Sequence, residues 1–235
     1  MISGLDHVSL TVADPDAAER AYGILLAAAP AAGRRFQLDN TALEIRGGGD
    51  EPAFGLVFAA PDPDEALRAL ARRGLPGDGP GLPLAATHGV MVSVTGETQP
   101  APPIRRADAP HAIDHVVIHT TNPERAAALY GARLGLDLRL DRANPQWGTR
   151  LLFFRLGGAV IEISAALNAP VSDGPDRITG LAWRVANPAA AQARLAAAGL
   201  DVSPVRAGRK PGTTVFTVRA GVPGAPALML GGAGR

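Results

Sequence analysis

The chain of 235 residues has no cysteine, few aromatic residues and almost no excess of charge. The absence of cysteine excludes disulfides, thiolate metal ligands and a cysteine nucleophile, and it is consistent with a reducing compartment. The formal net charge is +1, and no cluster of basic residues is larger than a pair such as Arg34-Arg35. Such a charge distribution gives no field that would attract nucleic acid or an anionic membrane surface. We therefore expect neither as a partner.

Long apolar segments are also missing. The longest uncharged apolar stretch, residues 21–33, is interrupted by Pro30 and is too short to span a bilayer. The N-terminal sequence MISGLDHV lacks the basic and apolar regions of a signal peptide. Hydrophobic residues make up 46% of the chain and charged residues 19%, values typical of a globular protein. The sequence predicts a soluble, cytoplasmic protein.

What the chain does contain is a repeat. The segment LDHVSLTVADPDAAERAYG at residues 5–23 returns as IDHVVIHTTNPERAAALYG at residues 113–131, an offset of 108. The two copies share Asp-His, Pro and Tyr-Gly at the same relative positions. A second pair of related segments begins at Gly55 and Gly180, an offset of 125. Self-similarity of this kind indicates duplicated structural units, here four units in two pairs.

All four segments follow one local pattern. A run rich in β-branched residues, such as HVSLTV or HVVIHT, is followed by Asp-Pro or Asn-Pro and then by an Ala/Leu/Arg-rich stretch. The Asx residue is a preferred helix N-cap, and proline is favoured at the first helical position. Further strand-like runs follow each helix, fewest in the second segment, where residues 76–83 are rich in Gly and Pro. The pattern predicts a strand, a helix and about three more strands in each unit.

A proline-dense stretch, TQPAPPIRRADAP at residues 98–110, separates the two pairs of units. Proline-rich segments of this length are typical of linkers between domains. We therefore predict two tandem domains, residues 1–100 and residues 111–235.

Four such units, with Asp-His at the start of the first and third, resemble the vicinal oxygen chelate superfamily. This superfamily includes glyoxalase I, extradiol dioxygenases and bleomycin-resistance proteins, and the resemblance covers nearly the whole chain. It implies an α+β fold of two tandem domains, each a pair of βαβββ modules that form a curved, mixed sheet enclosing a cavity. The first domain is the more degenerate copy.

The resemblance also implies candidate site residues. In this superfamily a divalent metal is commonly held by the start of a module's first strand and by its last strand. By position, His115 and Glu162 take these places in the third module, with His7 and Glu44 as the equivalent pair in the first. Imidazole and carboxylate ligands suit Fe, Mn, Ni or Zn and leave positions open for two substrate oxygens. His115 and Glu162 are accordingly the candidate catalytic residues.

The second and fourth modules depart from the family pattern. Gly55 and Gly180 stand where a first ligand belongs, and the last-strand position of the fourth module falls at about Met229. Each half therefore keeps at most half of a metal site. We expect one divalent metal, weakly bound, or none.

Further candidates lie in the C-terminal half. Trp147 and Arg150 precede one predicted strand, and Arg209 and Lys210 precede another. One aromatic ring and three cations could recognise an anionic or planar ligand, and Gly180 leaves room for one. These five residues are the candidate substrate-binding residues, so we expect the functional cavity in the second domain.

Two functions fit these observations. The first is a glyoxalase- or dioxygenase-like enzyme that acts on a small, oxygen-rich metabolite by a metal-assisted lyase, isomerase or oxygenase step. The alternative is a metal-free small-molecule binding protein of the bleomycin-resistance type. Because paired modules occur within one chain, both a monomer and a homodimer are compatible with the sequence.

Overall fold

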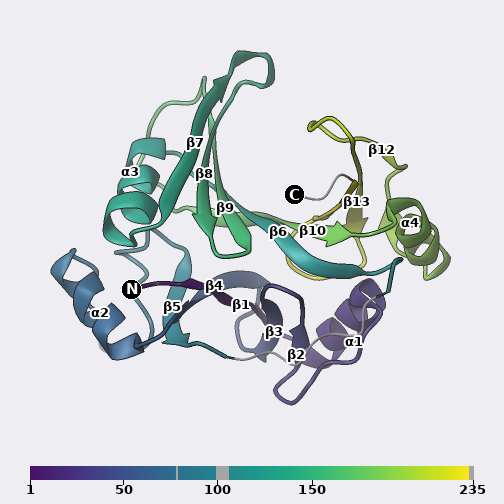
Figure 1. Ribbon diagram of the computed structural model, residues 1–235, viewed down its shortest axis with the longest axis horizontal. Helices are drawn as coiled ribbons and strands as arrows, with labels where there is room; N and C mark the ends of the chain where they lie inside the picture. The colour runs from purple at the N-terminus through teal and green to yellow at the C-terminus, as the bar shows by residue number, and fades with distance from the viewer. Residues whose placement is uncertain (78, 99–105, 233–235) are drawn as a thin grey trace. The chain divides into compact units, whose positions relative to one another are not determined.

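The computed structural model describes residues 1–77, 79–98 and 106–232, so that residues 99–105 of the predicted linker lie outside the described part (Figure 1). The elements are β1 (Gly4–Val12), α1 (Pro15–Leu26), β2 (Arg35–Gln37), β3 (Ala42–Gly47), β4 (Ala53–Ala60), α2 (Pro63–Arg72), β5 (Met91–Gly96), β6 (Pro110–His119), α3 (Pro123–Ala127), η1 (Ala128–Arg133), β7 (Asp137–Asn144), η2 (Pro145–Trp147), β8 (Thr149–Leu156), β9 (Ala159–Ala166), β10 (Arg177–Val185), α4 (Pro188–Ala197), β11 (Asp201–Val202), β12 (Arg206–Ala207), β13 (Thr213–Ala220) and β14 (Ala227–Gly232).

The strands form two mixed sheets, which confirms the α+β fold. The first sheet has the order β2-β3-β1-β4-β5 and uses strands of the first two units only. The second has the order β11-β13-β14-β10-β6-β9-β8-β7, with β12 paired to β13, and uses strands of the last two. The sheets therefore follow the two pairs of units predicted from the repeat.

The four principal helices begin in the same way. Asp14, Asp62, Asn122 and Asn187 are the N-caps, and each side chain accepts a hydrogen bond from the backbone N–H three residues later. Proline follows each cap at the first helical position. This confirms the Asx-Pro prediction, because such a cap satisfies an otherwise unpaired N–H and proline has none to satisfy. Among the described residues, none of the helices has the length and hydropathy of a transmembrane span.

The helix of the third unit differs from its counterpart in the first. α1 is a continuous α-helix, whereas α3 ends at Ala127 and continues as the π-helix η1. At its end the N–H of Leu134 donates to the carbonyl oxygen of Leu129, five residues earlier, over 2.8 Å. Such wide turns are rare and often mark functional sites. Tyr130, the tyrosine of the repeat, lies within η1.

The chain divides into two compact units, each with its own core. The first unit comprises residues 1–8, 54–99 and 116–179, and the second comprises residues 9–53, 100–115 and 180–235. Phe58, Leu75, Tyr130 and Phe154 are fully buried in the first unit, and Tyr22, Phe36, Trp183 and Phe216 are fully buried in the second. Each unit contains segments from both halves of the sequence. The boundary between residues 100 and 111 remains a prediction about which parts fold alone.

Within each unit one arginine binds the end of a helix from the other half of the sequence. Arg133 of η1 donates to the carbonyl oxygen of Arg73, just past α2, over 3.2 Å. Arg194 of α4 donates to the carbonyl oxygens of Ile24 (2.5 Å) and Leu25 (2.8 Å) at the end of α1. The last carbonyls of a helix lack partners within the helix, so each arginine stabilises a helix end.

β7 is the last strand in the order of the second sheet. Residues 137–143 are all exposed, and the register with β8 shifts between Leu138 and Leu140, which leaves Arg139 in a bulge. Arg139 also forms an exposed ion pair with Asp137 at 2.9 Å. β7 is therefore an exposed edge strand with an irregular backbone and charged side chains.

Candidate functional site

His115 lies on β6 beside the aspartate that precedes it. Its Nδ1 is 3.0 Å from Asp114 Oδ2, and Asp114 Oδ1 accepts a hydrogen bond from Arg184 Nε over 2.8 Å. The hydrogen bond from His115, together with that from Arg184, holds the pKa of Asp114 well below its usual range against the opposing effect of burial. An ionised carboxylate only accepts, so Nδ1 carries the proton and Nε2 has the lone pair in the neutral ring.

The first unit of the repeat has the same Asp-His contact in a more enclosed place. His7 Nδ1 is 2.6 Å from Asp6 Oδ2, and Thr98 Oγ1 donates to Asp6 Oδ1. The His7 side chain is 6% exposed, compared with 17% for His115. A ligand therefore reaches the imidazole of His115 more easily.

The two glutamates have different surroundings. Glu44 of β3 is bound by two arginines, since its Oε2 is 3.3 Å from Arg35 Nη1 and its Oε1 is 2.8 Å from Arg46 Nε. Glu162 lies on β9, half-buried and directly opposite Phe153 of β8. β9 and β6, the strands that carry Glu162 and His115, are neighbours in the sheet.

A metal site requires several His, Asp or Glu side chains close together. In residues 1–77, 79–98 and 106–232, no three or more His, Asp or Glu side chains are grouped so as to hold a metal ion. Metal sites in proteins typically use three or four protein ligands. The arginines on Glu44 and the enclosure of His7 make the first pair a poor donor set. The described donors therefore do not fit a tightly held resident metal.

The fourth module has an apolar last strand. A Cβ on Gly231 would meet Pro188 of α4, so Ala227, Met229 and Gly231 face this helix. Met229 is fully buried there, opposite Phe216 of β13. The other face of β14 carries only Leu228 and Leu230 before its end.

In the second module, Gly55 is buried in β4, and Glu97 lies just past the end of β5. Glu97 Oε1 accepts a hydrogen bond from Ser3 Oγ over 2.7 Å. Gly180 of β10 is half-buried. The described strands thus place no carboxylate at the last-strand positions of the even modules.

Arg150 is already bound by carboxylates of the protein. Its Nε and Nη2 donate to the two oxygens of Asp141 over 2.8 and 2.7 Å, and Nη1 donates to Glu124 Oε1 over 2.5 Å. These hydrogen bonds, first that to Asp141 and then that to Glu124, raise the pKa of Arg150. A ligand anion at this guanidinium must compete with both carboxylates. Trp147 in the neighbouring turn is 48% exposed.

Arg209 and Lys210 lie in the loop before β13 and are both exposed. The carbonyl oxygen of Lys210 accepts hydrogen bonds from the hydroxyl (2.5 Å) and the backbone N–H (3.1 Å) of Thr213, which closes the loop. The backbone of this loop is thereby fixed next to the strand. The binding role of both side chains remains a prediction.

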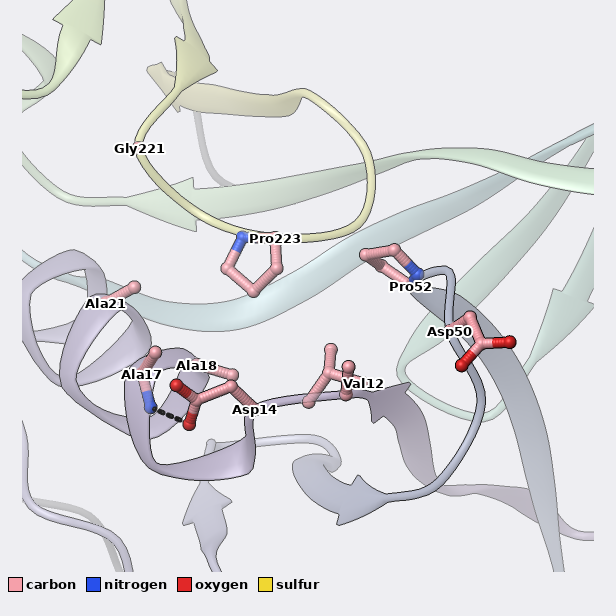
Figure 2. A pocket seen from close by; sticks show the side chains of 10 residues that line it. Val12, Asp14, Ala17, Ala18, Ala21, Asp50, Pro52, Gly221 and Pro223 are labelled. Atoms are coloured by element: carbon pink, nitrogen blue, oxygen red, sulfur yellow. Dashed lines mark hydrogen bonds between the residues drawn. The ribbon is translucent and has the colours of Figure 1, made fainter.

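A pocket of about 360 Å³ lies in the second compact unit (Figure 2). Its lining consists of Val12, Ala13, Asp14, Ala17, Ala18, Ala21, Asp50, Pro52, Gly221 and Pro223. Asp14 Oδ1 accepts the N-cap hydrogen bond from the N–H of Ala17 over 2.9 Å. None of the site residues predicted from the sequence lines this pocket.

The sequence analysis missed a buried ion pair in the first compact unit. Arg125 Nη2 donates to Asp176 Oδ1 over 2.8 Å and to the carbonyl oxygen of Gly174 over 2.7 Å. The side chain of Asp176 is fully buried and that of Arg125 is 14% exposed. The repeat contained a signal for this pair, since the offset of 108 places Arg125 at the position of Ala17.

A family profile matches part of the chain. The profile of the glyoxalase/bleomycin resistance protein/dioxygenase superfamily matches residues 114–217. A search of curated protein sequences found no match.

Solved structures cover the rest of the chain. A mutant of 4-hydroxymandelate synthase from Streptomyces coelicolor is 12% identical, covers 100% of this chain and 94% of its own, and has a TM-score of 0.72. The Mn(II)-bound glyoxalase from Novosphingobium aromaticivorans is 17% identical, covers 98% of this chain and 82% of its own, and has a TM-score of 0.68. At such identities the likeness establishes the fold. Residues 114–217 are thus similar to the glyoxalase/bleomycin resistance protein/dioxygenase superfamily, in line with the resemblance that the repeat indicated, and the whole chain has the fold of these two solved structures.

Proposed function

We propose that this protein binds a small, oxygen-rich metabolite through His115 and acts on it as a glyoxalase- or dioxygenase-like enzyme. The main observation behind this proposal is the contact of His115 with Asp114, whose other carboxylate oxygen accepts a hydrogen bond from Arg184. Paired and oriented in this way, the imidazole presents Nε2 as a proton acceptor. The match of residues 114–217 to this superfamily supports a small molecule as the ligand.

The chemistry assigned to His115 is general base catalysis. Nε2 accepts a proton from a ligand hydroxyl or from a carbon next to a carbonyl, and the Asp114 carboxylate stabilises the imidazolium that forms. Glu162 on the neighbouring strand is the second candidate catalytic group. Trp147, Arg150, Arg209 and Lys210 are proposed to bind the ligand, with Gly180 leaving space beside it.

Among the described residues, His115 and Glu162 are the proposed protein ligands of a divalent metal such as Fe, Mn, Ni or Zn. Binding through two protein ligands is weak and exchangeable, so purified protein is expected to contain little metal. The cytoplasmic location, and the choice between a monomer and a homodimer, remain predictions of the sequence.

A second function is favoured by the poor donor set. In this second function the site holds no metal, and the protein binds its ligand without transforming it, as a binding protein of the bleomycin-resistance type would. The ion pairs of Glu44 with Arg35 and Arg46 support this alternative for the first domain, since they leave the carboxylate neutralised by the protein itself.

A thermal-shift screen of small hydroxy acids, keto acids and catechols tests the binding proposal. The wild-type protein should respond to at least one compound, and His115→Ala and Glu162→Ala should lose the response. Glu44→Ala serves as the matched control, because it removes the equivalent carboxylate of the first module. A response lost only in Glu44→Ala would move the site to the N-terminal half and refute the assignment.

Titration calorimetry with Mn, Fe, Co, Ni and Zn tests whether a metal takes part. A metal-assisted reaction expects metal binding that disappears in the His115→Ala/Glu162→Ala double variant. Identical titrations of the wild type and the double variant would rule out the metal-assisted step and leave base catalysis by His115 or binding without chemistry, which an activity assay with the bound compound then separates.

A further inference from the structure

The pocket of Figure 2 corresponds, through the internal repeat, to the buried ion pair of the other compact unit. The offset of 108 places Ala17 at the position of Arg125 and Ala21 at the position of Leu129. The offset of 125 places Glu51, the residue after Asp50 of the lining, at the position of Asp176. Each copy thus has an acidic residue at or next to this position, whereas the long cationic side chain is present in one copy only.

In the first compact unit the place is filled by the protein itself. The guanidinium of Arg125 binds Asp176 Oδ1 and the carbonyl oxygen of Gly174, and Leu129 is fully buried. A planar guanidinium with several donors matches carboxylate and carbonyl acceptors of this kind.

In the second compact unit the equivalent side chains are two alanines, and the pocket takes their place. Figure 2 shows Ala17 and Ala21 of α1 on one side, Pro52 and Asp50 on the other, and Pro223 across the opening between them. The walls are mainly apolar, and Asp14 and Asp50 are the acidic residues of the lining.

The wall formed by the loop between β13 and β14 is held in position. The hydroxyl of Tyr22, the tyrosine of the repeat on α1, donates to the carbonyl oxygen of Pro223 over 3.0 Å. Tyr22 itself is fully buried. The pocket is therefore bounded by a fixed helix on one side and an anchored proline on the other, which lowers the entropic cost of binding.

We propose that this pocket binds a small molecule with a guanidinium group on a short apolar stem, in the place that Arg125 and Leu129 fill in the other copy. The stem packs on Ala17, Ala21 and Pro223, and the guanidinium binds the carboxylate of Asp50. This site is separate from the one around His115 and does not depend on its function.

The probe is n-butylguanidinium, followed by two-dimensional amide NMR of the full chain. Saturable shifts are expected at the amides of Ala17, Ala21 and Gly221. The neutral isostere n-butylurea is the matched control and should bind about two- to fivefold more weakly, because it keeps the stem and loses the charge. Equal responses to both probes, or no response to n-butylguanidinium, would overturn the proposal.

Substitutions then locate the site. Ala17→Arg restores the arginine of the other copy, so it should abolish probe binding and raise the unfolding temperature by about 2–4 °C. Asp50→Asn should weaken binding by about two- to fivefold, the range of an exposed ion pair. Asp64→Asn, which removes an exposed carboxylate from α2, should leave it unchanged. Unaltered binding in Ala17→Arg, or equal losses in Asp50→Asn and Asp64→Asn, would refute this location.

Discussion

Removing the carboxylate of Asp176 should destabilise the protein severely. Asp176 is fully buried, and the Arg125 guanidinium that it binds at 2.8 Å is 14% exposed. After Asp176→Ala, the carbonyl oxygen of Gly174 is the main acceptor left to this guanidinium. Breaking one partner of a buried ion pair costs about 3–5 kcal/mol, because the remaining charge stays desolvated. This is a large part of the stability of an ordinary domain.

Urea unfolding followed by fluorescence measures this loss. The midpoint of the Asp176→Ala variant should fall by more than about 1 M, given typical denaturant slopes. Asp173→Ala is the matched control, since Asp173 lies 3.6 Å from the same arginine but its side chain is 95% exposed. Its loss should stay below about 0.5 kcal/mol.

Removing the pair as a whole should cost much less than removing one partner. In the described part of the chain, Arg125 Nε, Asp176 Oδ2 and the hydroxyl of Tyr130 are buried without a hydrogen-bond partner. The buried polar atoms of the ion pair therefore lack some of their hydrogen bonds. The double variant Arg125→Met/Asp176→Leu should accordingly change the free energy of unfolding little. A double variant as unstable as Asp176→Ala, or an Asp173→Ala variant equally damaged, would refute the reasoning.

Three further expectations concern the acid range, the helix ends and the domains. Because the folded-state pKa of Asp114 is lowered, its contribution to stability is present above the ordinary aspartate pKa of about 3.9 and is lost as the pH falls through the lower folded value. In a series of unfolding measurements at falling pH, the free energy of unfolding of Asp114→Asn should accordingly decrease less steeply than that of the wild type. Arg194→Ala should cost about 1–3 kcal/mol by leaving the carbonyl oxygen of Leu25 unpaired, and a calorimetric change below about 0.5 kcal/mol would contradict this. The halves 1–104 and 105–235 should each fold by circular dichroism but unfold at lower temperature than the full chain, and two unfolded halves would place the boundary elsewhere.

The sequence predicted those features of the fold that depend on a few adjacent residues. Asp14-Pro15 and Asn122-Pro123 specify a helix start locally, and the structure confirms both. The π-helix η1 was not predicted, because the register of backbone hydrogen bonds within a helix leaves no mark in the spacing of apolar residues. In the second repeat segment, Gly81 of the Gly- and Pro-rich stretch forms an isolated bridge with Ser93.

For the candidate site, the sequence could name residues but not their partners. Arg35 reaches Glu44 because β2 and β3 pair them directly, and Asp141 reaches Arg150 across the hairpin of β7 and β8. Such partners depend on strand register, which turn geometry and burial fix only in the folded sheet. The repeat alone shows that Ala17 stands where the other copy has Arg125. That a pocket lies at this place can be seen only in the folded structure.

The irregular strand β7 has a consequence for the behaviour of the protein in concentrated solution. A straight, exposed edge strand can pair with the same strand of another molecule, and repeated pairing leads to fibrils. In β7 the bulge at Arg139, near the start of the strand, interrupts the ladder, and the charges of Asp137 and Arg139 flank Leu138. Two copies brought together along this edge cannot align their hydrogen bonds over its whole length, so the bulge acts as a gatekeeper against aggregation, and deleting Arg139 would remove that protection.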